Sequence, residues 1–270
     1  MPLSRSFLFV PGDRPDRFNK AANSDAHQVV LDLEDAVQPS EKDKARAAIA
    51  AWAGRTQAIV RINGADSPWF QGDLDFVRRL GLPKIMIPKA EPKALCAVAA
   101  GLGREVEIIG LIETVAGLLH LRETCRETRV SRLAFGHLDF SLDAGMAETD
   151  RQLDPVRLQI ALESRFASLP APIDGVFPTF SDPVALAADV QRAKALGFGG
   201  KLCIHPSQVA PVNDGFLPDA QELAWARRVI EAVEAAGDGA ISVGGAMVDR
   251  PVAERARAML RAHERGAAGR

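Results

Sequence analysis

Eight short apolar segments recur about every 25 residues, and each ends in polar residues or turn formers. Helix-like stretches separate them, a pattern typical of parallel strands that are buried on both faces. The segments are 7–10, 29–33, 58–60, 85–87, 108–112, 133–136, 173–177 and 201–204. Eight such units in 270 residues predict an α/β fold, a (β/α)₈ (TIM) barrel, whose functional residues lie at the C-terminal ends of the strands.

The intervening stretches carry helix signals. Ser40, followed three residues later by Asp43, resembles a capping box at the start of a helix over 41–52. Asp182 and Pro183 predict a capping residue and a first-turn proline for a helix over 184–196, which ends at Gly197.

Two acidic residues follow consecutive apolar segments, where each segment turns into a loop: Glu113 after 108–112 and Asp139 after 133–136. In neighbouring parallel strands both carboxylates leave the same end of the sheet, one or two strand spacings of about 5 Å apart. A hard divalent cation between them would relieve their repulsion, although each acid alone also suits a solvated strand end. The barrel groups them on one rim with Asp13, Arg14, Glu34, Asp35, Arg61, Lys89 and His205.

The barrel does not require the last segment of the chain. An apolar helical stripe over 218–236, an alternating pattern around Gly-Gly over 240–248 and a second helix over 251–264 follow it. We therefore expect a barrel over 1–210 and a helix–hairpin–helix extension over 211–270, which acts as a lid or an oligomerisation arm. Asp249 directly precedes the last helix, and its simplest role is that of an N-cap.

Composition excludes several classes. Lys+Arg total 33 and Asp+Glu 35, and no basic run interleaves with aromatic residues, so we expect no nucleic-acid partner. No apolar stretch is long enough for a membrane span, and residues 1–5 do not resemble a signal peptide. Three cysteines without paired spacing suit a reducing cytoplasm. The sequence has no tyrosine, which excludes a phenol as general acid.

Six motifs, in order along the chain, resemble the HpcH/HpaI aldolase superfamily, and within it the citrate lyase beta-subunit-like branch that includes malyl-CoA and citramalyl-CoA lyases. They are Phe-Val-Pro-Gly-Asp-Arg-Pro at 9–15, Leu-Asp-Leu-Glu-Asp-Ala-Val at 31–37, Val-Arg-Ile-Asn at 60–63, Ile-Pro-Lys at 87–89, Leu-Ile-Glu-Thr at 111–114 and Gly-Lys-Leu-Cys-Ile-His-Pro-Ser-Gln at 200–208. The resemblance implies a (β/α)₈ barrel with a C-terminal extension.

The resemblance also implies roles at the metal. Glu113 and Asp139 would be the protein ligands of Mg²⁺, with water and substrate oxygens completing an octahedron. Arg61 would bind the carboxylate of a small 2-keto acid through its planar fork. Glu34 and Asp35 would hold metal-bound waters and orient Arg61.

Further roles follow from the same resemblance. Arg14 and Lys89 would add positive charge where a CoA or acyl-carrier thioester binds. Asp249 would act as general acid/base in a neighbouring subunit's active site, which implies a homo-oligomer, a trimer or a multiple of it.

The chain departs from the family pattern at two places. The family often has Gly-Ala/Pro-Glu-Asp around the second ligand, where this chain has His137 and Leu138 before Asp139. We expect His137 to form a hydrogen bond near the metal rather than to bind it. Ala246 replaces a family lysine, which puts the thioester contact in question.

The reaction that the resemblance implies is Mg²⁺-dependent cleavage or formation of a 3-hydroxyacyl thioester, with a 2-keto acid and an acyl thioester as the products. Two alternatives remain: a thioesterase for malyl-CoA or a similar thioester, and a citrate lyase beta subunit that is active only in a complex. A Schiff base on Lys89 would be redundant beside a two-carboxylate metal site.

Overall fold

The computed structural model describes residues 3–52, 54, 57–102, 106–147, 151–236, 241–243 and 245–267. They fall into two compact units: Leu3–Asn213 and a second unit that begins at Asp214.

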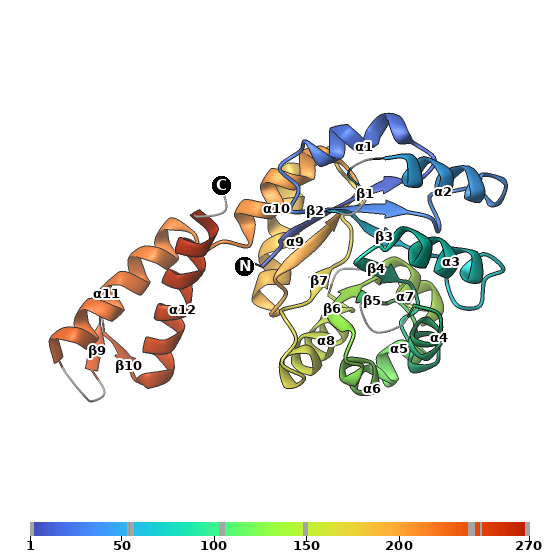
Figure 1. Ribbon diagram of the computed structural model, residues 1–270. Coiled ribbons are helices and arrows are strands. Elements are labelled where there is room, and N and C mark those ends of the chain that lie inside the picture. Colours follow the sequence, from blue (N-terminus) through green and yellow to red (C-terminus); the bar gives the residue numbers. More distant parts are fainter. Residues whose placement is uncertain are drawn as a thin grey trace. The chain divides into compact units, whose positions relative to one another are not determined.

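The first unit (Figure 1) is a barrel. It is closed by eight parallel strands in chain order, in which β8 pairs with β1. The strands are β1 (Ser6–Pro11), β2 (Gln28–Asp32), β3 (Ile59–Arg61), β4 (Lys84–Ile87), β5 (Glu107–Ile112), β6 (Val130–Phe135), β7 (Ile173–Asp174) and β8 (Gly200–Cys203). Each of the eight predicted apolar segments overlaps one strand. The predicted (β/α)₈ barrel is confirmed.

Helices connect the strands and lie on the outside of the barrel (Figure 1). They are α1 (Pro15–Ala22), α2 (Lys42–Ala51), α3 (Phe70–Leu80), α4 (Pro92–Leu102), α5 (Val115–Leu119), α6 (Leu121–Arg126), α7 (His137–Asp143), α8 (Asp154–Phe166), α9 (Pro183–Ala195) and α10 (Val209–Gly215), with 3₁₀ turns η1 (Pro39–Glu41) and η3 (Pro206–Gln208).

The two predicted helix starts had different outcomes. Asp182 caps α9 by accepting a hydrogen bond of 2.9 Å from the Ala185 N–H, and Pro183 is the first helical residue, as expected. The capping box at Ser40 is wrong. Ser40 lies inside the turn η1, whose backbone bond from Glu41 N to the Gln38 carbonyl leads directly into α2, so no side-chain cap is needed there.

The barrel interior is filled by apolar side chains from all eight strands: Phe7, Val30, Ile59, Met86, Ile109, Leu111, Ala134, Ile173 and Leu202. Because side chains alternate along a strand, the neighbours of Ile173 and Leu202 face outward, toward the helices. These neighbours are Asp174 and Lys201, and both are fully buried.

Asp174 is the centre of a buried ionic cluster between strands and helices. Its carboxylate accepts hydrogen bonds from Lys201 Nζ (2.7 Å) and from Arg157 Nε of α8 (2.8 Å), and Lys201 also pairs with Asp189 of α9. Burial alone would raise the pKa of Asp174, but the charges and hydrogen bonds of Lys201 and Arg157 hold it well below its usual range. The cluster ties α8 and α9 to β7 and β8.

The second unit contains α11 (Ala220–Ala236), a hairpin of β9 (Ile241–Val243) and β10 (Ala246–Val248), and α12 (Arg250–Ala267). Its buried core consists of Ala226, Val229, Val248 and Ala256. The helix–hairpin–helix order matches the prediction. Residues 240 and 244 of the predicted hairpin lie outside the described residues, and Gly245 has a φ of 83°, which glycine adopts readily.

None of the described helices has the length and apolar character needed to cross a membrane. The three cysteines, Cys96, Cys125 and Cys203, are free thiols.

We expect Asp174→Asn to lower the free energy of unfolding by about 3–5 kcal/mol, because the change removes one charge from a buried ionic cluster. The contribution of Asp174 is present above the ordinary carboxyl pKa and is lost as the pH falls toward its depressed folded value. Urea unfolding followed by circular dichroism measures the difference. The control is Asp75→Asn, which breaks an exposed pair with Arg78 and should cost at most about 1 kcal/mol. Equal losses in the two variants would contradict the account.

Candidate active site

A cavity of about 890 Å³ opens at the C-terminal ends of the strands. Its walls combine apolar side chains, such as Leu8, Leu111 and Phe135, with polar and charged ones. The predicted rim residues that line it are Arg14, Asp35, Arg61, Glu113, Asp139 and His205. Glu34 and Lys89 do not line it, but they contact Arg61 and Glu113 respectively. The structure thus brings six of the nine predicted rim residues to one cavity, and Asp13 is not among its lining residues.

Arg61, the last residue of β3, is buried among acids. Asp32, at the end of β2, accepts hydrogen bonds of 2.7 Å from both Arg61 Nε and Arg61 Nη2. Burial alone would raise the pKa of Asp32, but the Arg61 charge and these bonds lower it. Asp32 therefore occupies the Nε–Nη2 edge of the fork that the sequence prediction had assigned to a ligand. The Nη1 edge faces the loop after β2.

Glu34 and Asp35 stand on that loop. Arg61 Nη1 lies 2.9 Å from Glu34 Oε2, within ion-pair distance but outside hydrogen-bond geometry, and 3.5 Å from Asp35 Oδ2. Burial raises the pKa of Glu34 to about 9, with Arg61 opposing the rise and Glu113 and Asp35 adding to it.

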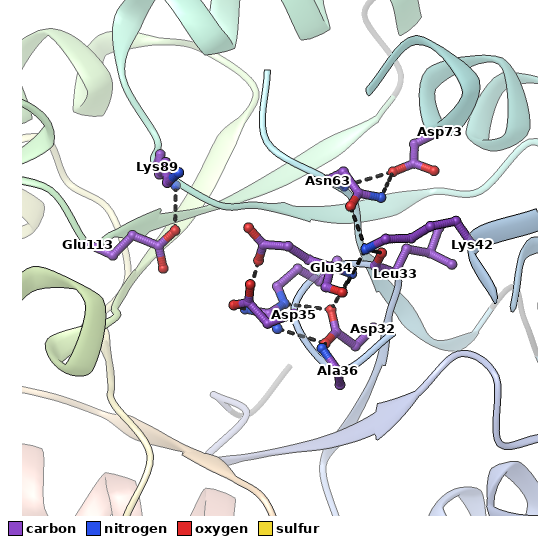
Figure 2. Close-up of polar contacts among 11 residues, drawn as sticks. Asp32, Leu33, Glu34, Asp35, Ala36, Lys42, Asn63, Asp73, Lys89 and Glu113 are labelled. Carbon is purple, nitrogen blue, oxygen red and sulfur yellow. Dashed lines mark hydrogen bonds and ion pairs between the residues drawn. The ribbon is translucent and has the colours of Figure 1, made fainter. Parts of the chain in front are cut away.

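Glu113 follows β5 directly and is 3% exposed. Its Oε1 accepts a hydrogen bond of 2.9 Å from the Lys89 N–H (Figure 2). Burial raises the pKa of Glu113 to about 8, against the effect of Arg61 and with a further rise from Asp139. A Cβ at Gly136 would lie 2.7 Å from both Cβ and Oε2 of Glu113, so the glycine provides the space that this side chain occupies.

Asp139 lies on a helix rather than on the predicted loop. It is in the first turn of α7, which begins immediately after β6 and Gly136. The Phe140 N–H donates to the Gly136 carbonyl (3.0 Å), and Ser141 Oγ donates to the His137 carbonyl (2.8 Å). The helix therefore begins directly after Gly136. Burial raises the pKa of Asp139, and Asp35 adds to the rise.

Lys89 adopts a left-handed backbone conformation, with a φ of 46° that few non-glycine residues show. This strained geometry aims its N–H at Glu113. Its ammonium is half-exposed and lies 3.7 Å from Asp66 Oδ2. The backbone, more than the charge, links Lys89 to the acidic cluster.

His137 lines the cavity, but its ring is turned into the protein. Nδ1 is buried and has no hydrogen-bond partner in the described part of the chain, so the expected hydrogen bond is not made through this atom. The ring packs against Gly175, where a Cβ would overlap Nδ1. Burial lowers the pKa of His137 to about 4, which keeps the ring neutral.

A basic face of α1 forms another part of the cavity wall. Arg17 and Lys20 line it together with Arg14, at a spacing of three residues that places them on one side of the helix. Arg14 also pairs with Asp16 at 3.1 Å on the surface. The same cavity thus joins an acidic end, around Glu113, to a basic end.

Asp249 belongs to the second unit and caps α12. Its Oδ1 accepts a hydrogen bond of 3.2 Å from the Val252 N–H, and its carbonyl accepts one of 3.0 Å from the Ala253 N–H. The N-cap role is confirmed. The catalytic role of Asp249 stays a prediction, because no contact among the described residues tests it.

Comparison with known proteins decides the family. The family model described as HpcH/HpaI aldolase/citrate lyase matches residues 5–206. The chain belongs to this family. A citrate lyase subunit beta-like protein of Deinococcus radiodurans is 37% identical over 97% of this chain and 98% of its own length. An L-malyl-CoA/beta-methylmalyl-CoA lyase of Cereibacter sphaeroides is 34% identical, covering 97% of this chain and 95% of its own.

Two further matches bear on chemistry within the HpcH/HpaI family. A (3S)-malyl-CoA thioesterase of Cereibacter sphaeroides is 32% identical over 91% of this chain and 89% of its own length. The crystal structure of CitE from Mycobacterium tuberculosis in complex with magnesium, acetoacetate and coenzyme A has a TM-score of 0.88 and 31% identity, covering 97% of this chain and 98% of that chain. The family model and the lyase relatives support an enzyme of the CoA-thioester lyase type.

Sequence reasoning did not single out Asp32, Arg17, Lys20 or Gly175. Asp32 had a signal, since a carboxylate that ends an otherwise apolar strand requires a buried partner. The three-residue spacing from Arg14 could have identified Arg17 and Lys20. Nothing in the sequence pairs Gly175 with His137, because that contact joins two different strand ends.

We expect Gly175→Ala to displace the His137 ring and to cost about 1–3 kcal/mol of stability, because the added Cβ overlaps Nδ1 and would lie 2.9 Å from the Phe135 carbonyl. Chemical denaturation of Gly175→Ala, His137→Ala and the double variant measures the coupling. Combined with His137→Ala, the substitution should cost less than the sum of the two single effects. Strictly additive losses would show that the ring and the glycine do not meet.

Proposed function

We propose that this chain is a Mg²⁺-dependent carbon–carbon lyase. It cleaves or forms a 3-hydroxyacyl thioester, and its products are a small 2-keto acid and an acyl thioester of CoA or an acyl carrier. The observation that carries the proposal is the single cavity that runs from the buried acids around Arg61 to the basic face of α1. One end suits a cation and a small anion, and the other suits the phosphates of a carrier.

Glu113 and Asp139 are the proposed Mg²⁺ ligands. In the part of the chain that is described, no three His, Cys, Asp or Glu side chains converge on one point. Two carboxylates fit Mg²⁺, which binds few protein ligands and keeps waters and substrate oxygens. The raised pKa values of buried Glu113 and of Asp139 also fit, because carboxyls that repel one another gain from a cation. When bound, Mg²⁺ would act as a Lewis acid toward the keto-acid oxygens.

Arg61 is proposed to orient the keto-acid carboxylate. Asp32 holds the Nε–Nη2 edge, so the ligand would meet the guanidinium at Nη1, between Glu34 and the cavity. A guanidinium fixed by Asp32 loses little conformational freedom when a ligand binds.

In the cleavage direction the substrate hydroxyl loses its proton and the C–C bond breaks. The bond's electrons move to the thioester side, giving an enolate and the 2-keto acid. Glu34 and Asp35, the acidic pair beside Arg61, are proposed to take up the hydroxyl proton. Asp249 of an adjacent subunit is proposed to protonate the enolate.

The thioester carrier is proposed to lie along α1. Arg14, Arg17 and Lys20 supply three positive charges to the cavity wall, and Lys89 adds another near the acidic end. A carrier with phosphate groups is the matching partner. Exposed Ala246 in place of the family lysine favours a carrier contact made mainly by the barrel unit.

The proposed assembly is a homotrimer or a multiple of it, in the cytoplasm. Each unit exposes apolar side chains: Leu142 (82%) and Phe180 (55%) in the barrel unit, and Met247 (69%) in the hairpin of the second unit. Such surfaces suit contacts between copies of the chain.

The related thioesterase supports a second candidate, in which water cleaves the thioester. A citrate lyase beta subunit that needs partner subunits is a third, supported by the relative named citrate lyase subunit beta from Leuconostoc mesenteroides.

Product order distinguishes the first two candidates. With malyl-CoA, citramalyl-CoA or β-methylmalyl-CoA and Mg²⁺, we expect the 2-keto acid to appear while the acyl thioester stays intact. Rapid-quench chromatography follows both products. Free CoA released before any keto acid would identify a thioesterase, and no turnover by the purified chain would favour the subunit role.

Asp249→Ala and Asp139→Ala chains should each be inactive as homo-oligomers but active when co-expressed. In a randomly mixed ring roughly a quarter of the interfaces would join an intact metal site to an intact Asp249. Steady-state assays of purified mixed oligomers, carrying different affinity tags, measure the recovery. Verified mixed oligomers without activity would show that Asp249 does not act across an interface.

A further inference from the structure

Lys42, the first residue of α2, carries a buried ammonium that contacts neutral oxygens. Its Nζ donates to the Leu33 carbonyl (2.7 Å), to the Glu34 carbonyl (2.8 Å) and to Asn63 Oδ1 (2.8 Å), as Figure 2 shows. The residue is 5% exposed. Three donors meet three acceptors, so the group is fully satisfied. An ammonium buried with no carboxylate bond among the described residues calls for an explanation.

The Asn63 acceptor is held in place by Asp73 of α3. Asp73 Oδ2 accepts hydrogen bonds from Asn63 N (2.8 Å) and Nδ2 (2.6 Å). Because a carboxylate only accepts, it fixes the amide with its NH₂ toward Asp73 and its oxygen toward Lys42. Asp73 Oδ1 accepts from Arg46 Nε (2.7 Å), one helical turn after Lys42 on the same face of α2. The ammonium site is therefore built by two helices.

The Leu33–Glu34 peptide forms hydrogen bonds on both of its sides. The carbonyl of the Leu33–Glu34 peptide accepts from Lys42, and its N–H donates to Asp32 Oδ1 at 2.9 Å. In a trans peptide these two groups point in opposite directions. Asp32 Oδ2 also accepts from the Ala36 N–H at 3.0 Å. A buried cation and a buried anion thus clamp the loop that carries Glu34 and Asp35.

We propose that Lys42 is a positioning residue for the reaction: through the carbonyls of Leu33 and Glu34 it sets where the Glu34 and Asp35 carboxyl groups stand beside Arg61. Lys42 does not line the cavity, so it acts through the loop. This inference rests on the proposed lyase function and deepens it. The clamp fixes the Glu34 backbone, and the Glu34 side chain then reaches Arg61 Nη1 at 2.9 Å.

The test compares Lys42→Met with Lys44→Met, both assayed per folded active site. Methionine keeps the unbranched stem but removes all three donors, leaving the two carbonyls unpaired. We expect kcat to fall at least tenfold in Lys42→Met, with the KM for the acyl thioester within twofold of the parent, because the basic face of α1 is untouched. Lys44 is exposed and pairs with Glu41, so Lys44→Met should behave like the parent. If Lys42→Met does not fold, Lys42→Gln, which keeps an N–H donor, takes its place.

A double-variant cycle with Glu34→Gln separates positioning from general destabilisation. If Lys42 acts through Glu34, its replacement in the Glu34→Gln background should cost less than a third of its effect in the parent. Equal effects in the two backgrounds would overturn the inference.

The crystal structure of Lys42→Met provides a readout that does not depend on activity. A displaced or rotated Leu33–Glu34 peptide supports the inference, and an unchanged peptide overturns it. A parent protein without lyase turnover would instead overturn the proposed function, while this structural comparison still decides whether Lys42 holds the loop.

Discussion

The pair formed by Arg61 and Asp32 is the interaction on which the mouth of the barrel depends. It joins the ends of β2 and β3, places a permanent positive charge among buried acids and leaves the Nη1 edge of the guanidinium to Glu34 and Asp35. Breaking such a pair leaves an uncompensated buried charge, which costs far more than the pair itself contributes. The surrounding groups, which include Lys42 and Glu34, hold the Arg61 charge and the loop after β2 in one geometry.

That single cation does not balance the acids around it. Burial raises the pKa of Glu34 to about 9 and that of Glu113 to about 8, even with Arg61 nearby. A further positive charge would stabilise the ionised form of carboxyl groups whose pKa values are raised in this way. The space for such a charge beside them is the cavity. The two ends of the cavity therefore suit different ligands. The acidic end suits a cation with a small anion, and the basic face of α1 suits an anionic carrier.

The sequence predicted what depends on local pattern. Period and spacing of apolar residues gave all eight strands, and Asp182 with Pro183 gave the start of α9. The prediction from sequence was wrong where backbone hydrogen bonds or tertiary contacts determine the local structure. A 3₁₀ turn replaced the cap at Ser40, and α7 began so soon after β6 that Asp139 lies on a helix. Residues at the ends of different strands, such as Asp32 and Arg61, can be identified as partners only when the closed barrel is known.

We propose that Glu113 and Asp139 together hold a divalent cation. Calorimetric titration of Mg²⁺ into the parent, Asp139→Asn and Asp143→Asn tests it without any substrate. Asp143 lies one turn further along α7, and its carboxylate accepts a hydrogen bond from the Val115 N–H, which asparagine can also accept. We expect one Mg²⁺ site per chain, an affinity at least tenfold weaker in Asp139→Asn and an unchanged affinity in Asp143→Asn. Parent-like affinity in Asp139→Asn would contradict it.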